Sequence, residues 1–132
     1  MTEAMFRRIA LGLDGAFESE HMGHPDFRAH GRIFATLRGD GKHGMVALTP
    51  EQQRRYLNEH PDAFTPASGA WGRSGSTMVT LAAADAEIVG EAMTLAWQNA
   101  AARLKPRAPA RLNTRAPKRI AAAKKTKRRR SS

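Results

Sequence analysis

The stretch Gly69–Leu81, GAWGRSGSTMVTL, constrains the fold more than any other part of the chain. Glycine recurs at every third position from 69 to 75, so the backbone there can adopt positive φ or approach a neighbouring surface closely. Residues 77–81 then alternate in a run rich in strand formers, which predicts a β-strand. Asp85 follows directly and begins the longest amphipathic helix expected in the chain. We therefore expect a turn, a strand and a covering helix in succession.

The remaining residues predict a small α+β domain. Helices are expected at residues 3–13, 50–60 and 85–103, the first two capped by Thr2 and Thr49. Strands are expected at residues 16–22, 26–30, 32–37, 45–48 and 77–81, with a short one at 63–65. Because tight turns join successive strands, we expect a two-layer sandwich, an antiparallel sheet with helices packed on one face, in the order α-β-β-β-α-β-β-α.

Charge divides the chain into two parts. Residues 1–104 carry ten Lys and Arg and all twelve Asp and Glu, a net charge of −2. Residues 105–132 carry the other twelve Lys and Arg and no acidic residue, a net charge of +12. Proline and alanine dominate the rest of this segment, which therefore has too little apolar surface to order itself. We predict a domain at 1–104 and a disordered basic tail at 105–132.

The end of this tail is its most basic part. Its eight candidate nucleic-acid contacts are Lys118, Arg119, Lys124, Lys125, Lys127, Arg128, Arg129 and Arg130. A flexible cationic arm gains affinity by releasing counterions from phosphates and needs no fixed geometry to do so. Phosphate contacts carry no base information, so the predicted binding is sequence-non-specific, to DNA or alternatively RNA. A solubilising tail, adhesion to an acidic membrane surface and a localisation signal are the other interpretations, and we favour nucleic acid.

Two further candidates lie in the glycine-rich loop. Trp71 can stack on a base, or it can cover the sheet edge as a core or lid residue, and the second interpretation is favoured. Arg73 is a candidate phosphate contact beside a loop that can form an anion nest, although a plain structural turn is favoured there. Trp97 lies on the apolar stripe of the last helix and is expected in the core.

Several kinds of chemistry are not expected. The chain has no cysteine, which excludes disulfides, thiolate metal sites and cysteine nucleophiles. His21 and His24 have metal-like spacing, but on one strand they would face opposite sides, so no metal is predicted. The segment Gly72–Gly75 lacks the spacing of a nucleophile elbow. The acids expected at the surface of the first strands are Glu18, Glu20 and Asp26. We predict no catalytic residue, no cofactor and no enzyme activity.

The sequence also bears on location. No apolar run approaches the roughly 18–20 residues that span a bilayer, and no apolar signal core follows Arg7 and Arg8. We therefore expect a cytoplasmic protein without a membrane partner, with association to a bacterial nucleoid as the more specific option.

Over roughly residues 1–105 the chain resembles the MmcQ/YjbR family. The motifs that carry the resemblance, in family order, are LGLDGAFESEHMGHPDFRAHGRIFATL, MVALTPEQQ, GAWGRSGSTMVTL and AWQNAAARLKP. The resemblance implies a small two-layer α+β domain like that of secretion chaperones or the CyaY type. It also implies DNA binding and no catalytic residue. Ser76 stands where many relatives carry a bulky aromatic residue or histidine. The basic tail lies outside the family pattern and looks like the Lys/Ala/Pro tails of histone-like proteins.

The sequence thus predicts a non-enzymatic nucleic-acid-binding protein. Its tail supplies electrostatic affinity, and its domain supplies shape and contacts to a protein partner or a homodimer. An alternative is a protein-interaction or chaperone-like module to which the tail is ancillary. A third interpretation is a small-molecule-binding domain that uses the loop around Trp71.

Overall fold

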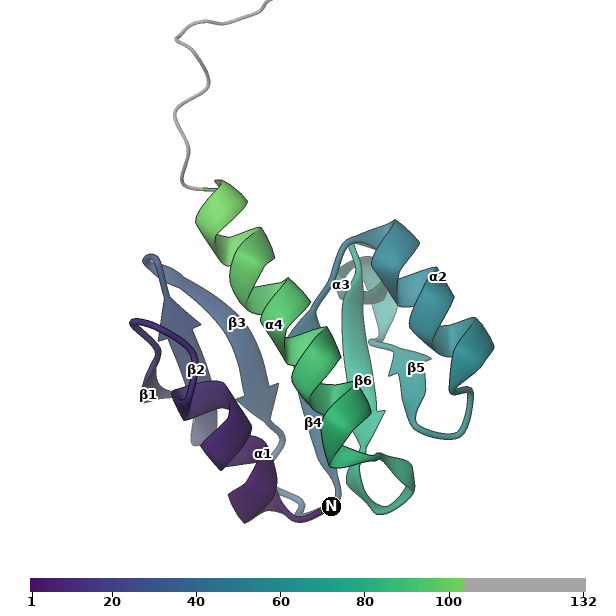
Figure 1. The fold of residues 1–132 in the computed structure, drawn as a ribbon, viewed down its shortest axis with the longest axis horizontal. Coiled ribbons are helices and arrows are strands. Elements are labelled where there is room, and N and C mark those ends of the chain that lie inside the picture. The colour runs from purple at the N-terminus through teal and green to yellow at the C-terminus, as the bar shows by residue number, and fades with distance from the viewer. Residues whose placement is uncertain (104–132) are drawn as a thin grey trace, which may run out of the picture.

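Residues 1–103 are the part of the chain that the structure, a computed structural model, describes. An antiparallel sheet forms one layer of this part and helices form the other (Figure 1). The six strands lie in the order β1-β2-β3-β4-β6-β5. They are β1 (Phe17–His21), β2 (His24–Ala29), β3 (Arg32–Leu37), β4 (His43–Ala47), β5 (Phe64–Pro66) and β6 (Ser76–Thr80).

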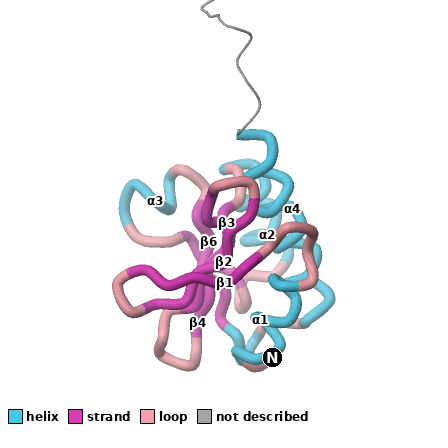
Figure 2. The backbone as a smooth tube through the Cα atoms, turned by 90° about the vertical axis from the view of Figure 1, so that its left-hand side faces the viewer, coloured by secondary structure: helices cyan, strands magenta, loops and turns pink. Residues whose placement is uncertain are grey.

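Three helices cover one face of the sheet. They are α1 (Glu3–Leu11), α2 (Pro50–Glu59) and α4 (Ala86–Arg103). A further short helix is α3 (Gly69–Arg73). The long helix α4 crosses the middle strands, with α1 and α2 on either side of it (Figure 1). The short helix α3 projects on the opposite side of the sheet, as does the hairpin of β1 and β2 (Figure 2). The sheet therefore has one covered face and one open face.

The predicted fold class is confirmed, with two additions to the element order. The strands expected at 16–22, 26–30, 32–37 and 45–48 are all present, as β1 to β4, which is one more than the three strands that the predicted order places between the first two helices. The glycine-rich loop contains the helical turn α3, which lies off the common helical layer. None of the helices within residues 1–103 has the length and apolar character needed to cross a bilayer.

The predicted helix starts are confirmed by hydrogen bonds. The Thr2 hydroxyl accepts from the Met5 amide at 3.1 Å. At the start of α2, Thr49 and Gln52 form a reciprocal capping box, with N···O distances of 2.9 and 3.2 Å. The Asp85 carboxylate accepts from the Glu87 amide at 2.9 Å, which caps α4. Local sequence therefore defines where each long helix begins.

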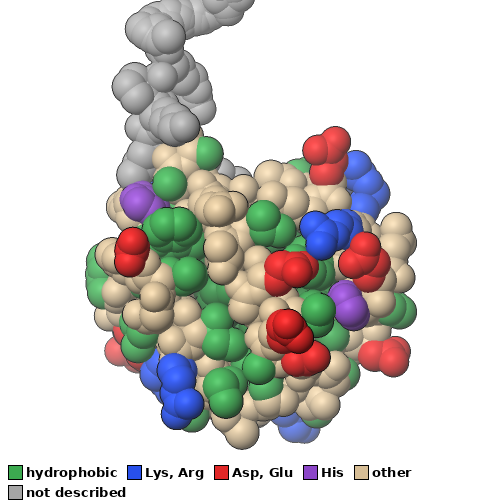
Figure 3. All heavy atoms as spheres, viewed as in Figure 1, with side chains coloured by type: hydrophobic (Ala, Val, Ile, Leu, Met, Phe, Trp, Pro, Cys, Tyr) green, Lys and Arg blue, Asp and Glu red, His purple; other side chains and the backbone are tan. Residues whose placement is uncertain are grey.

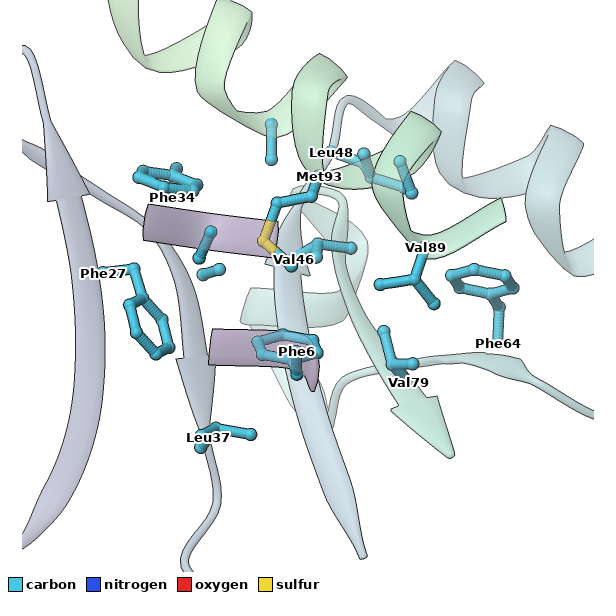
Figure 4. Packing of buried hydrophobic residues seen from close by; sticks show 14 of the residues in the cluster. Phe6, Phe27, Phe34, Leu37, Val46, Leu48, Phe64, Val79, Val89 and Met93 are labelled. Atoms are coloured by element: carbon cyan, nitrogen blue, oxygen red, sulfur yellow. The ribbon is translucent and has the colours of Figure 1, made fainter. Parts of the chain in front are cut away.

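The core lies between the covered face of the sheet and the helices (Figure 4). Its largest fully buried side chains are Tyr56, Phe6, Phe27, Phe34, Phe64, Leu37, Leu48, Leu81, Met93, Val46, Val79 and Val89. Phe6 packs against Phe27, with ring centroids 6.1 Å apart, and over Gly44, where a Cβ would lie 2.6 Å from its ring. Trp97 is half-buried at the margin of the core rather than within it. Its indole N–H donates to the Asp14 carbonyl at 2.8 Å, so the ring must stay near the surface.

Tyr56 is a buried polar group in the core. It is fully buried, and its hydroxyl donates to Glu91 Oε1 at 2.7 Å. Burial raises the pKa of Tyr56, and the hydrogen bond to the Glu91 carboxylate raises it further. Since a raised folded pKa stabilises the protonated form, this contribution to stability is complete below about pH 10 and is lost as the pH rises above it.

Tyr56 is the only tyrosine of the chain, so its ionisation can be followed alone by ultraviolet absorbance. We expect tyrosinate to form well above pH 10 in the folded protein and near pH 10 after unfolding in denaturant. In Glu91→Gln the folded transition should move down toward pH 10, because the neighbouring negative charge is gone. A folded wild-type protein that titrates near pH 10 would contradict the buried hydrogen bond.

Candidate binding surfaces

Trp71 and Arg73 are the two predicted site residues within the described part of the chain. Both lie on α3 and both are exposed. The other predicted contacts, Lys118 to Arg130, lie outside the described residues. Trp71 is 75% exposed, so the favoured interpretation of a core or lid residue is wrong. The reason is that α3 stands off the sheet, and no helix of the covering layer reaches its outer side (Figure 2).

Two glycines fix the position of α3. A Cβ at Gly72 would collide with the Ala67 carbonyl, and one at Gly75 would collide with the Leu48 carbonyl. Gly75 also has φ +113°, in the region that L residues avoid. Gln53, buried on α2, donates through Nε2 to the carbonyls of Gly72 and Ser76, at 3.0 Å each. The loop is therefore closely packed against α2 and the end of β4, and only its outer side is free.

This packing bears on the anion-nest interpretation. Within the loop, the Ser74 amide donates to the Ala70 carbonyl and the Gly75 amide donates to the Gly72 carbonyl, both at 3.0 Å. The Thr77 hydroxyl donates to the Gly75 carbonyl at 2.8 Å and is buried. Because these donors already bond to carbonyls of the loop, they stabilise the turn and are not free to bind an anion. A structural turn is the role that the sequence favours for the loop.

His21 and His24 correct another expectation. They belong to two strands, β1 and β2, and lie directly opposite each other across a two-residue turn. They therefore share one face of the sheet, whereas on a single strand they would face opposite sides. The turn residues Met22 and Gly23 both have positive φ, 54° and 81°, which is the geometry of a tight hairpin. Within residues 1–103 no group of three His, Cys, Asp or Glu side chains is placed to hold a metal ion.

A groove of about 900 Å³ runs across the open face of the sheet. The β1–β2 hairpin, with His21, Met22 and His24, forms one wall, and α3 with Trp71 forms the other. Met22 is 83% exposed and Trp71 75%. Two large apolar side chains are thus exposed to solvent on opposite rims, and the apolar floor between them joins them into one surface.

The floor of the groove is a row of side chains that crosses the sheet. Strand pairing places Asp26 beside Thr36, Thr36 beside Met45, Met45 beside Met78, and Met78 beside Thr65. Directly paired residues share a face, so the row lies opposite the core residues that alternate with it. The groove is accordingly apolar at its centre, where the two methionines lie.

Asp26 is buried rather than a surface acid. It is 1% exposed, and its two carboxylate oxygens accept from Arg28 at 2.8 and 3.1 Å. Residues two apart on a strand face the same side, which makes this two-bond pair geometrically natural. The hydrogen bond to Asp26 raises the pKa of Arg28. The only carboxylate of the groove lining is therefore already neutralised, while Arg38 of the same lining has no ion-pair partner among the described residues.

The covered side of the molecule carries an acidic surface over α2 and the start of α4 (Figure 3). Glu59, Asp62 and Asp85 line a small hollow of about 240 Å³ there. Arg55 lies among these acids and contacts Glu59 at 3.6 Å and Glu91 at 3.1 Å. Arg54, which is exposed on the same helix, and Arg55 do not neutralise the four carboxylates of Glu59, Asp62, Asp85 and Glu91, so this side disfavours phosphate.

Fold and surfaces together define a small α+β domain with one covered sheet face and one grooved, open face. A sequence model of the YjbR family matches residues 11–99. The chain therefore belongs to the YjbR family, as its motifs predict. No curated protein matches it at a significant level.

A solved structure shares the fold. The chain is similar to the crystal structure of Deinococcus radiodurans protein DR2400, whose domain is classified as DUF419. The TM-score is 0.58 at 19% sequence identity, and the match covers 69% of this chain and 72% of that one. At this identity the likeness establishes the fold alone.

Proposed function

We propose that this protein binds nucleic acid, DNA in the first place, mainly through phosphate contacts made by residues 105–132. The observation that supports the proposal most strongly is the separation of charge. Twelve cations and no acid follow a domain whose own residues sum to −2. A protein that neutralises several phosphates gains affinity from each released counterion, whatever the base sequence.

In this proposal the domain contributes less affinity for phosphate than residues 105–132, because the charges of residues 1–104 sum to −2. Arg7, Arg28 and Arg55 are each paired with a carboxylate. The acidic surface over α2 and α4 repels phosphate from the covered side (Figure 3). Trp71 and Arg73 are exposed together on α3, on the other side of the sheet, and are the domain residues we assign to secondary contacts. In this proposal the domain has no catalytic role and the protein acts in the cytoplasm.

The test is a variant in which Lys124, Lys125, Lys127, Arg128, Arg129 and Arg130 are all glutamine. We expect its affinity for a labelled 20-base-pair duplex at 50 mM salt to fall by at least about a hundredfold, because six cations are lost. Two duplexes of unrelated sequence should bind the wild-type protein equally. Arg54→Gln with Arg55→Gln, on the acidic side, is the control and should leave affinity unchanged. An unaltered affinity in the six-residue variant would refute the proposal.

The open-face groove favours a second candidate function, the binding of a protein partner. Exposed Met22 and Trp71 and an apolar floor are features of interaction surfaces. In that case the tail is ancillary.

A further inference from the structure

We propose that the groove on the open face of the sheet binds an amphipathic helical segment of another protein, with acidic residues beside its apolar face. This inference rests on the second candidate function, and it is independent of nucleic-acid binding by the tail. It is carried by the dimensions of the groove, the chemistry of its floor and the charge of its lining.

The groove has the dimensions of a short helix. Its floor crosses β2, β3, β4 and β6, which at about 4.8 Å per strand spacing extends roughly 14 Å. A helix rises 1.5 Å per residue, so apolar residues at positions i, i+4 and i+7 extend about 10.5 Å and fit within this floor. The β1–β2 hairpin and α3 rise on either side and would flank such a helix (Figure 2).

The side chains of the floor and rims can adapt to apolar partners of different shapes. Met22, Met45 and Met78 are three of the six methionines of the chain, and all three line the groove. Methionine is unbranched and polarisable, so a methionine-rich surface adapts to different apolar partners. Trp71 adds a large, exposed contact of the type that anchors interfaces.

The charges of the groove lining favour a helix that carries acidic residues. Arg38 is the only Lys or Arg of the lining, and it has no ion-pair partner among residues 1–103. Asp26, the only acid of the lining, is already paired with Arg28. His21 and His24 add no negative charge. A segment with a carboxylate near Arg38 therefore complements the groove, and a basic segment does not.

Three other occupants fit less well. The tail of this chain has twelve cations and no acid, which is the wrong charge for Arg38. Nucleic acid would meet one arginine and one non-histidine aromatic side chain, too few for phosphate tracking and base stacking along the groove. A second copy would bring one concave face against another, with α3 and the hairpin in the way (Figure 2).

The experiment uses the full chain with ¹³C-labelled methionine methyl groups, observed by NMR. The probe is a 14-residue helical peptide with leucine on one face and glutamate on the other, and the matched peptide has glutamine in place of glutamate. Met22, Met45 and Met78 report on the groove, and Met1, Met5 and Met93 serve as internal controls. We expect the glutamate peptide to shift the three groove signals and leave the controls in place.

Two variants sharpen the test. Met78→Lys, on the open face, should weaken the peptide's effect about tenfold or more, because it places a charge at the centre of the apolar floor. Met93→Leu, on the covered face, should leave it unchanged. Arg38→Gln should remove most of the preference for the glutamate peptide over the glutamine peptide, which we expect to be severalfold in the wild-type protein.

Several outcomes would overturn the proposal. Peptide binding without groove shifts would mean that only the basic tail captures the peptide. Groove shifts on dilution of the protein alone would identify a second copy as the occupant. Groove shifts with a single-stranded oligonucleotide and none with either peptide would identify nucleic acid. Loss of duplex binding in the six-glutamine tail variant has no bearing on these shifts, so the two functions can fail separately.

Discussion

Replacing Gly75 with alanine is expected to lower the free energy of unfolding by about 3–4 kcal/mol. Two costs combine. The native φ of +113° is unfavourable for an L residue, by about 1–2 kcal/mol. The new Cβ also collides with the Leu48 carbonyl, which is main chain at the junction of β4 and α2 and cannot rotate away. Such a loss is a large fraction of the roughly 5–15 kcal/mol that stabilises a typical domain.

The matched control is Gly69→Ala in the same loop. Gly69 also has positive φ, +63°, but nothing lies within 4 Å of its Cβ position. We expect a loss of only about 1–2 kcal/mol, from the backbone conformation alone. Urea unfolding followed by circular dichroism measures the free energy of unfolding of both variants. The loss is read from the shift of the denaturation midpoint, provided that the dependence on urea concentration is unchanged. Equal losses in the two variants would mean that the loop is not packed against Leu48 as described.

Removing residues 105–132 is the change with the largest expected effect on binding. We expect the affinity of residues 1–104 for a labelled duplex at 50 mM salt to be at least about a thousandfold below that of the full chain. The truncated protein keeps every helix and strand of the described domain, which ends with α4 at Arg103, and a net charge of −2. Its circular dichroism spectrum should show the same helix and strand content per molecule.

A comparable affinity in the truncated protein would move the binding site into the domain. Trp71→Ala and Arg73→Gln would then be the variants to measure, because both residues are exposed on α3. With the tail present, we expect each of them to change affinity less than tenfold.

Features encoded by neighbouring residues could be predicted from the sequence. The Thr49–Gln52 capping box depends on a spacing of three residues, and the predicted pair forms both hydrogen bonds. The regular glycines at 69, 72 and 75 predict backbone that only glycine tolerates, and Gly72 and Gly75 meet that description. Alternation along residues 77–81 correctly predicts a strand there, and β6 runs from Ser76 to Thr80.

Features that depend on which strands become neighbours could not be predicted in this way. His21 and His24 face the same side because a turn separates them, and three-residue spacing does not distinguish that from a continuous strand. An aspartate in a strand is expected at the surface, yet Asp26 is buried in the groove, where it is paired with Arg28. Gln53 lies in a polar helix, and only the approach of the α3 loop gives it two partners.

The groove itself left a weak signal in the sequence. Met45 and Met78 alternate with the core residues Val46 and Val79, so both faces of β4 and β6 carry apolar side chains. A strand with two apolar faces indicates a second contact surface, but it does not show that the two methionines pair across the sheet. The large apolar ring of Trp71 favours a core or lid position in the sequence, and the ring's size does not reveal that α3 stands away from the sheet.

The most direct test of the central claim, that the basic tail binds nucleic acid through phosphate contacts, is the salt dependence of duplex affinity. Fluorescence anisotropy titrations of the full chain and of residues 1–104 between 50 and 300 mM salt give the slope of log affinity against log salt. Six neutralised phosphates predict a slope of about −5 for the full chain. Residues 1–104 should show no measurable binding over this range. A slope near zero for the full chain, or the same steep slope for both proteins, would contradict the account.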